Sequence, residues 1–287
     1  MRSGVRWGYL AFVARIDYSD VARDFLRLVG IAPLRPDLAY LTKLARAFSR
    51  LPYENFTKII RAGEVEDPKE RPRMPDLVFA DHVDLGTGGT CFSLTHFFRT
   101  VLEFAGFEAD PVMCDRSYGP NTHCALIVPL GRERFLVDPG YLMEKPLAVP
   151  KEGESVQRGD TSTIRLRRLG RSNQLILITE RKGASKLRYR LRDVPVGEDL
   201  FHELWVDSFD WAMMRHLTAS KRIGEGQLFM RDGMLRLVNG TRKSQDRIGK
   251  GFSNEIERSF GIDGRIVSVA EDAVRHLREN YIGRRGI

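Results

Sequence analysis

The middle of the chain constrains the fold most, because residues 109–192 form a succession of short strand-like segments. Short runs rich in β-branched and other apolar residues, bounded by turn residues, are typical of strands. Six such segments are separated by turn-forming or charged residues: 109–114, 123–130, 133–140, 162–169, 174–180 and 186–192. Short strands with this punctuation predict an antiparallel sheet or a small barrel.

Helical periodicity precedes the strands. Residues 17–29 and 37–48 carry apolar residues at the spacing of an amphipathic helix. A third helix is predicted over residues 90–105, because an apolar run begins there and ends before Gly106. Between the second and third helices a loop is predicted by three prolines among charges, Pro68, Pro72 and Pro75.

The C-terminal part mixes both patterns. Residues 199–217 and 269–282 are predicted to be helices. Residues 227–240 predict a hairpin that turns on Asp232-Gly233, a dipeptide suited to tight turns between strands. The fold class is therefore α+β, and the chain divides into three predicted domains: 1–86, 87–194 and 195–287.

Composition limits the class of protein. With 287 residues, of which 42% are hydrophobic and 29% charged, the chain can bury a sizeable core and shows no bias toward disorder. No apolar run approaches the roughly 18 residues that span a bilayer, so no membrane partner is expected. Residues 7–14 resemble a minimal signal-peptide core, but an amphipathic helix follows without a convincing cleavage site. Three cysteines, an odd number, argue against a disulfide framework and favour a cytoplasmic location.

The net charge of +8 is concentrated in residues 165–171 and 181–192. The second segment alternates basic with apolar residues: Lys186, Leu187, Arg188, Tyr189, Arg190, Leu191 and Arg192. This pattern predicts a strand with one apolar and one cationic face. The cationic face is interpreted as a solvated surface, or alternatively as a patch for a phosphate-bearing ligand or an acidic protein. Nucleic acid is not expected, because no known motif or interleaved exposed aromatic residues accompany the charges.

Cys91 follows Gly88-Gly89 and begins the third predicted helix. A free thiol titrates at about 8.5, so a nucleophilic cysteine needs a lowered pKa. The glycines allow a sharp turn, and the helix that follows offers unpaired N–H groups and the positive end of its dipole. The same N–H groups, that of Cys91 included, are suited to hold an oxyanion. Cys91 is predicted to be a nucleophile, against the alternative of a packing residue.

His123 is the predicted base because of its hairpin. The segment 123–140 reads as two strands joined near Leu130-Gly131, and a loop of two or four residues centred there places His123 opposite Asp138. Directly opposite residues have Cβ atoms about 4.5–5.5 Å apart on one face. An odd-length loop or a bulge would break this register. With it, Asp138 orients the imidazole and a Cys–His–Asp triad results.

The remaining histidines and cysteines are assigned packing or surface roles. His82 has acidic neighbours but no recognised ligand spacing, so no metal is expected. Cys124 neighbours His123 on a strand and therefore points to the other side. Cys114 is likewise interpreted as a packing residue. Glu54 and Asn55 are interpreted as holding a domain interface by hydrogen bonds rather than as doing chemistry.

The motifs resemble those of the arylamine N-acetyltransferase family, cytoplasmic enzymes of the transglutaminase-like cysteine group. The resemblance covers most of the chain and rests on six segments in order: YLAFVARIDY, LPYENFTKII, GGTCFSLTHFF, THCALIV, FLVDPGYL and the segment 211–240. It implies an N-terminal helical bundle, a central β-barrel and a C-terminal α/β lid, which match the three predicted domains.

The resemblance also implies a mechanism. Cys91 would carry an acyl group taken from a thioester such as acetyl-coenzyme A, with His123 as base and Asp138 as the residue that orients it. An amine or hydrazine would then accept the group. The thioester is a co-substrate, and no permanently bound cofactor is implied.

Four further residues are candidates for substrate or coenzyme contacts. Phe92 adjoins the nucleophile, and the other three stand at matching positions of the family motifs: Thr122, Gly140 and Tyr141. The chain departs from those motifs where an arginine, a glutamate and an asparagine near the nucleophile are replaced by Thr87, Ser93 and Thr95. Leu142 replaces a glycine of the turn that in the family lies against the coenzyme phosphates. We expect a rebuilt polar network around Cys91 and a hindrance to ordinary coenzyme A.

Three functions remain open from the sequence. The first is transfer of an acetyl or larger acyl group to an amine, with a free thioester or an acidic acyl carrier protein as donor; related amide synthases act on carrier-bound groups. The second is a hydrolase or transglutaminase-like cysteine enzyme. The third is a binding module without catalysis.

Overall fold

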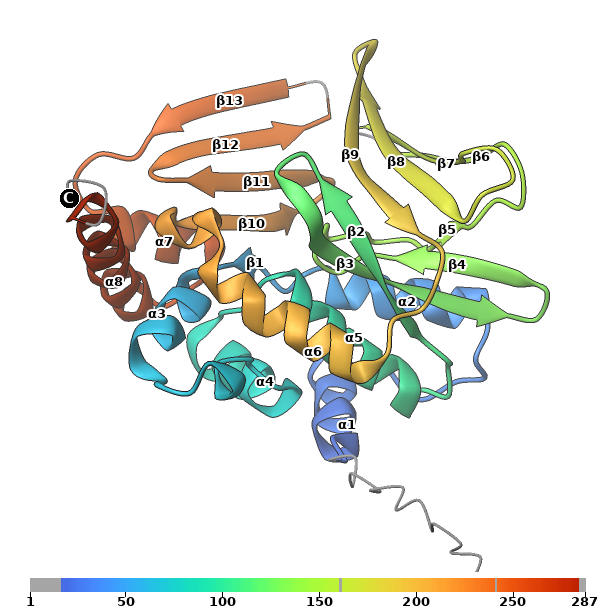
Figure 1. Cartoon of the computed structure of the whole chain (residues 1–287), viewed down its shortest axis with the longest axis horizontal. Coiled ribbons are helices and arrows are strands. Elements are labelled where there is room, and N and C mark those ends of the chain that lie inside the picture. Colours follow the sequence, from blue (N-terminus) through green and yellow to red (C-terminus); the bar gives the residue numbers. More distant parts are fainter. Residues whose placement is uncertain (1–16, 160–161, 241, 284–287) are drawn as a thin grey trace, which may run out of the picture.

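The computed structural model describes residues 17–159, 162–240 and 242–283. Figure 1 shows helices α1 to α6 along one side of the molecule, a strongly curved sheet of β2 to β9 above them, and a second sheet of β10 to β13 beside the first. The signal-like residues 7–14 lie outside the described residues. An α+β chain with antiparallel sheets is thus confirmed.

The N-terminal helices form largely where the sequence predicts them. Asp37 caps α2 by accepting a hydrogen bond from the Tyr40 N–H at 2.7 Å. The prediction of a loop through Pro75 is wrong, because Pro75 is the first residue of a helix, where its missing N–H costs nothing. The helices of this part are α1 (Ser19–Leu28), α2 (Leu38–Phe48), α3 (Phe56–Glu64), α4 (Pro75–Leu85) and α5 (Cys91–Phe104).

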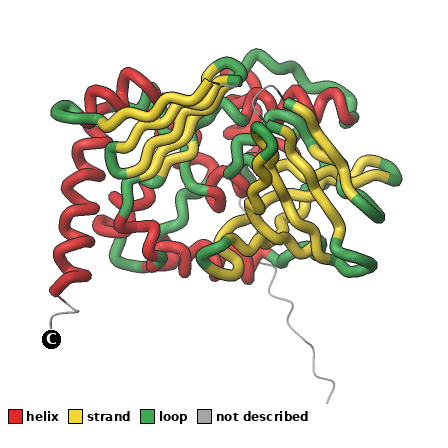
Figure 2. Tube along the Cα trace, turned by 90° about the horizontal axis from the view of Figure 1, so that it is seen from above, coloured by secondary structure: helices red, strands yellow, loops and turns green. Residues whose placement is uncertain are grey.

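The central strands form one antiparallel sheet in the order β5-β4-β3-β2-β9-β8-β7-β6. Its terminal strands β5 and β6 contact each other, so that the sheet is nearly closed into a barrel, as Figure 2 shows from above. The strands are β2 (Asp110–Arg116), β3 (Gly119–Leu130), β4 (Glu133–Val137), β5 (Leu147–Ala148), β6 (Glu154–Arg158), β7 (Thr163–Arg168), β8 (Gln174–Arg181) and β9 (Ala184–Arg192). Strand β9 buries Tyr189 and Leu191 as predicted, but Leu187 is exposed.

The register predicted for the β3–β4 hairpin is wrong by two residues. Val128, not Leu126, lies opposite Phe135, because the turn is made by Gly131 and Arg132. Gly131 has φ +61°, which a glycine adopts without strain. A shift of two keeps every side chain on its predicted face, since the strand period is two.

The C-terminal part contributes a second antiparallel sheet in the order β1-β10-β11-β12-β13. The predicted hairpin is confirmed: Arg231 pairs with Met234, and Asp232 and Gly233 both have positive φ. The helix predicted over 199–217 is shorter, because α6 ends at Asp207 and two 3-10 turns follow. The elements are β1 (Tyr53–Glu54), α6 (Glu198–Asp207), β10 (Thr218–Ile223), β11 (Gly226–Arg231), β12 (Met234–Asn239), β13 (Arg242–Arg247), α7 (Phe252–Phe260) and α8 (Gly264–Gly283).

Asn55 joins the N-terminal part to the second sheet. Its side chain donates to the carbonyl of His216 at 2.7 Å and accepts from the Thr218 N–H at 2.8 Å. The interface role predicted for Asn55 agrees with these bonds, whereas the Glu54 side chain bonds within the N-terminal part, to Thr57 and Arg73. The division into domains at residues 86 and 194 stays a prediction.

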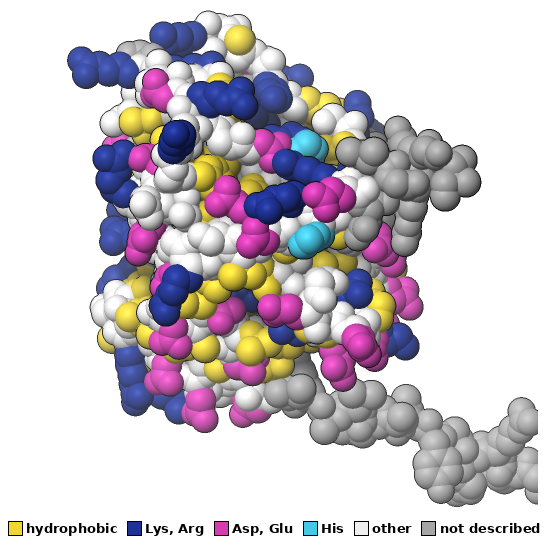
Figure 3. Space-filling view, turned by 90° about the vertical axis from the view of Figure 1, so that its left-hand side faces the viewer, with side chains coloured by type: hydrophobic (Ala, Val, Ile, Leu, Met, Phe, Trp, Pro, Cys, Tyr) yellow, Lys and Arg dark blue, Asp and Glu magenta, His cyan; other side chains and the backbone are white. Residues whose placement is uncertain are grey.

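Two observations bear on partners. Over the described residues no helix is long and apolar enough to cross a membrane. Basic and acidic side chains are interspersed on the face that includes α8, without a large area of one sign (Figure 3).

Candidate active site

The entry to α5 is held by close backbone contacts rather than by a sharp turn. A Cβ added at Gly88 would come within 1.8 Å of the Pro52 carbonyl oxygen, so only glycine fits there. The next residue, Gly89, accepts a hydrogen bond from the Glu54 N–H at 3.0 Å. The segment before the helix is thus fixed to β1, and Cys91 becomes the first residue of α5.

Cys91 is buried, with 5% of its surface exposed. The pKa of its thiol lies well below the ordinary value, first because Cys124 donates a hydrogen bond to the sulfur and then because His123 bonds to it and carries a positive charge; burial opposes both. Cys124 shares an apolar cluster with Cys91 and Phe92. The sequence analysis missed the contact between Cys124 and Cys91, because alternation along a strand does not predict which other elements pack against each of its faces.

His123 and Asp138 are in direct contact. The imidazole Nε2 lies 2.7 Å from Oδ2 of Asp138, and both residues are 1% exposed. Burial alone would lower the pKa of His123, but the charge and hydrogen bond of Asp138 and the contact with Cys91 outweigh it and raise the pKa to about 9. The side chains meet diagonally across the hairpin, as the two-residue shift in register requires.

Asp138 receives two further hydrogen bonds. The Tyr189 hydroxyl donates to Oδ2 at 2.8 Å, and the Tyr141 N–H donates to Oδ1 at 2.8 Å. The Tyr189 ring also lies 5.0 Å from the His123 ring between centroids. Tyr189 was assigned only to the apolar face of β9, so its contact with the carboxylate is a feature that the sequence analysis missed.

Gly140 lies against the side chains of Cys91 and His123. A Cβ added at Gly140 would come within 2.7 Å of the Cys91 Cβ and 3.0 Å of the His123 Cε1. One methyl group would therefore collide with both. Tyr141 follows on the surface side, with the guanidinium of Arg188 5.8 Å above its ring.

Leu142 adopts a backbone conformation that favours glycine, with φ +54°. Its N–H donates to the Pro139 carbonyl at 3.1 Å, which closes the turn after Asp138. The side chain is only 3% exposed. Because it is buried, it exposes almost no surface; the hindrance to coenzyme A expected from the sequence stays a prediction.

Phe92 and Thr122 lie close to the centre but have protein partners. Phe92 is fully buried against Phe201 and Trp205 of α6, at 5.3 and 6.3 Å between ring centroids. The Thr122 hydroxyl donates to the Gly119 carbonyl at 2.7 Å. Their contact with substrate stays a prediction.

A buried polar network lies beneath α5, and its cation is Arg73. The guanidinium donates to the Thr57 hydroxyl at 2.6 Å and the Gly88 carbonyl at 2.9 Å, and it lies 3.6 Å from the carboxylate of Glu54. It also pairs with Asp81 at 2.6 Å. Arg73 is thus a buried cation beside the glycine pair that follows Thr87. The sequence analysis missed it, because Arg73 stands in an irregular segment 15 residues before Gly88.

No metal site is formed by these groups. Over the described part of the chain, no cluster of three or more His, Cys, Asp or Glu side chains is arranged to hold an ion.

Comparison with known proteins places this geometry in a family. A family model described as N-acetyltransferase matches residues 37–265. A search of curated proteins finds no match.

Several solved structures share the fold. An arylamine N-acetyltransferase from Mycobacterium abscessus has a TM-score of 0.78 at 17% identity, over 94% of this chain and 99% of its own. The Mycobacterium smegmatis arylamine N-acetyltransferase has a TM-score of 0.72 at 24% identity, over 88% and 96%. The Mycobacterium marinum enzyme in complex with CoA has a TM-score of 0.74 at 17% identity, over 88% and 98%. Since the family model spans most of the chain and this fold accompanies it, the chain belongs to the N-acetyltransferase family, the arylamine N-acetyltransferase family that its motifs resemble.

Proposed function

We propose that this protein transfers an acyl group from a thioester to an amine through an acyl-enzyme on Cys91. One observation carries the proposal: a thiol of lowered pKa at the start of a helix contacts an imidazole that is itself bonded to a buried carboxylate. Because Nε2 of His123 faces Asp138, Nδ1 is the nitrogen available to Cys91. Triads of this form activate cysteine nucleophiles on unrelated folds.

The two half-reactions follow from these positions. The Cys91 sulfur attacks the carbonyl carbon of the thioester, and the leaving thiolate takes the proton from His123. The acceptor amine then attacks the acyl carbon, gives a proton to His123 and releases the cysteine thiolate. The first-turn N–H groups of α5, that of Cys91 included, are placed to stabilise the oxyanion in both steps.

The donor is proposed to be acetyl-coenzyme A or a larger acyl thioester, used as a co-substrate. CoA is bound in the solved M. marinum relative. In this chain the pKa of Lys186 is lowered, first by the charge of Arg188, then by burial and by the charges of Arg236 and Arg116. Basic side chains of β2, β9 and β12 are therefore close enough to repel one another. Such a group suits the phosphates of a free coenzyme or of a carrier-bound donor. With its cysteines free in the structure, the protein is proposed to act in the cytoplasm.

The test is the fate of the acyl group. The protein is incubated with acetyl-coenzyme A and an arylamine, and the products are separated. We expect N-acetylarylamine and free coenzyme A, and no product from Cys91→Ala. Release of acetate without amide would favour the hydrolase alternative, and consumption of neither substrate would contradict the proposal.

A further inference from the structure

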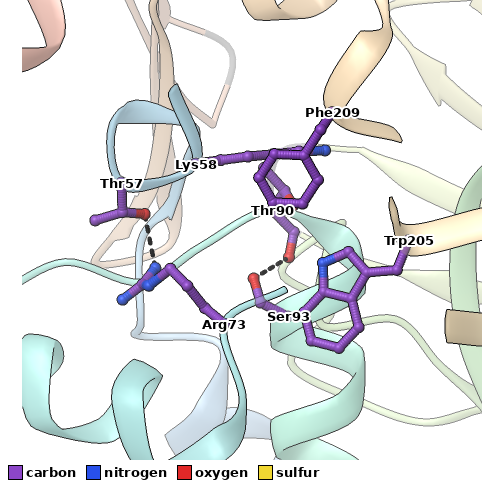
Figure 4. Close-up of a pocket in the computed structure, with 7 residues that line it drawn as sticks. All are labelled: Thr57, Lys58, Arg73, Thr90, Ser93, Trp205 and Phe209. Carbon is purple, nitrogen blue, oxygen red and sulfur yellow. Dashed lines mark hydrogen bonds between the residues drawn. The ribbon is translucent and has the colours of Figure 1, made fainter. Parts of the chain in front are cut away.

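A lysine is buried behind the first turn of the nucleophile helix. Figure 4 shows Lys58 of α3 beside a small pocket that is also lined by residues of α5, α6 and the segments next to them. The lining residues are Thr57, Lys58, Arg73, Thr90, Ser93, Trp205 and Phe209. Thr90 and Ser93 flank Cys91 in sequence, so the pocket lies directly against the helix start that carries the nucleophile.

The Lys58 ammonium group is held without a carboxylate partner among the described residues. It is 7% exposed, and its hydrogen bonds go to Ser208, whose carbonyl oxygen accepts at 2.9 Å and whose hydroxyl also accepts. The nitrogen lies 4.6 Å from the Phe209 ring centroid and 5.4 Å from that of Trp211. Carbonyl, hydroxyl and aromatic faces all favour a cation, but none of them neutralises its charge.

The charge of Lys58 acts in a nearly dry region. The space open to the centre of a water molecule in the pocket is about 10 Å³, which is room for roughly one water. Phe56 and Ile59, on either side of the Thr57-Lys58 pair, pack in the same apolar cluster as Cys91. Charges in such surroundings are screened far less than charges on the surface.

We propose that Lys58 is a positioning residue whose ammonium group stabilises the thiolate of Cys91 from behind α5. This inference rests on the proposed role of Cys91 as nucleophile. Lys58 touches neither substrate nor the reacting atoms, and acts by lowering the free energy of the negatively charged sulfur. Acylation removes that negative charge, so Lys58 favours the free thiolate over the acyl-enzyme.

The groups that face Lys58 agree with this role. Burial lowers its pKa to about 7, while the negative charges of Cys91, Cys124 and Asp210 act to raise it. The ammonium form is therefore present below about pH 7, where the acidic limb of Cys91 lies, and is lost above it. Arg73, on another side of the pocket, is balanced by Glu54 and Asp81. Since the pKa of Cys124 is raised well above its ordinary value, Cys91 is the sulfur that carries negative charge near neutral pH.

The test is the pH dependence of Cys91 alkylation by iodoacetamide, followed by intact mass from about pH 4 to pH 10. Lys58→Met keeps the length of the side chain and removes its charge. In this variant we expect the acidic limb of the curve of alkylation rate against pH to move up by about one pH unit. At pH values below that limb, alkylation of Cys91 then slows roughly tenfold. Lys221→Met is the matched control, because Lys221 is a half-buried lysine bonded to the Phe260 carbonyl at 2.6 Å and should leave the limb unchanged.

A second measurement does not depend on a folded variant. In the wild type labelled with ¹³C at lysine Cε, the Lys58 signal is titrated before and after iodoacetamide blocks Cys91. We expect blocking to lower the pKa of Lys58, because the neighbouring anion is gone. The inference is overturned if folded Lys58→Met keeps the wild-type acidic limb of Cys91 alkylation, or if blocking Cys91 leaves the pKa of Lys58 unchanged. In both cases Cys91 of the wild type still reacts with iodoacetamide. If wild-type Cys91 itself does not react, the proposed function fails instead.

Discussion

Gly140 and Cys91 lie so close that a single added carbon at Gly140 would approach the Cys91 Cβ to 2.7 Å and its Cα to 2.9 Å. Real side chains do not make such contacts, so the turn after Asp138 and the start of α5 can approach only through a glycine. The distance between Cys91 and His123 thus depends on a residue that has no side chain.

Gly140→Ala is expected to reduce acyl transfer by about a hundredfold, because the new methyl group must push Cys91 and His123 apart. The rate of acetyl-coenzyme A consumption measures this. Gly63→Ala is the control, since Gly63 lies in α3 with nothing within 4 Å of an added Cβ and should keep full activity. Equal activity of the two variants would show that the contact is not needed.

Tyr189→Phe removes a hydrogen bond to the charged carboxylate of Asp138. We expect the free energy of unfolding to fall by about 1.5–3 kcal/mol and acyl transfer to fall about tenfold, because Asp138 then orients His123 less firmly. The effect on rate should vanish in an Asp138→Asn background if Tyr189 acts only through that carboxylate. Chemical denaturation and initial rates of the four proteins test this cycle, and independent, additive effects on rate would refute it.

The Cys91–His123 pair predicts a plateau in stability against pH. His123 is raised from 6.5 to about 9, so its contribution is present below 6.5 and is lost as pH rises through about 9. Cys91 is lowered from 9.0, so its contribution is present above 9.0 and is lost as pH falls through its folded value. Between about 6.5 and 9 the folded pair and the unfolded chain each hold one proton on these two groups, so the pair itself adds no slope. Lys58, whose pKa is lowered from 10.5 to about 7, adds a rise in stability above about pH 7 in every variant that keeps it.

Cys91→Ala should remove this cancellation. Relative to the wild type, its free energy of unfolding is expected to fall from about pH 6.5 upward, because Asp138 still raises the pKa of His123 while the compensating thiolate is gone. The part of that rise that Cys91 causes is lost as well, so the relative decline ends below about pH 9. Urea denaturation of both proteins between about pH 6 and pH 9.5 measures the slopes. A wild-type curve that parallels that of the variant throughout would argue against an ionised pair.

Leu142→Gly sets two effects against each other. A leucine at φ +54° costs about 1–2 kcal/mol, which glycine would recover. Removing a side chain that is 3% exposed loses more, about 2–5 kcal/mol. We expect the variant to be less stable by about 1–3 kcal/mol in thermal or chemical denaturation, and a more stable variant would show that backbone strain dominates.

The sequence was sufficient to predict on which face of a strand a side chain lies, but not which residues of other elements it contacts. Period-two alternation predicted His123 and Asp138 on one face of a hairpin. The turn residues were misassigned, but the register is shifted by an even number of residues, so both side chains stay on that face and meet. The prediction for Pro75 was wrong because the sequence alone does not distinguish a proline at the start of a helix from a proline within a loop. The difference depends on how the segment packs.

The sequence analysis missed three residues near the Cys91 site for one reason: Lys58, Arg73 and Tyr189. Each lies on a segment outside α5 and comes close to Cys91 only when helices and sheet pack together. A residue pattern within one element holds no signal for such contacts. The motif departures at Thr87, Ser93 and Thr95 did predict a rebuilt polar network, without indicating which residues form it.

The most direct measurement of the central claim is the intact mass of the protein after brief exposure to acetyl-coenzyme A without an acceptor. We predict that the wild type gains the mass of one acetyl group, that fragmentation places it on Cys91, and that adding an arylamine removes it. Cys91→Ala should gain nothing. A folded wild type that never acquires the group from acetyl-coenzyme A or longer acyl thioesters, or an acetyl group found equally in Cys91→Ala, would contradict the account.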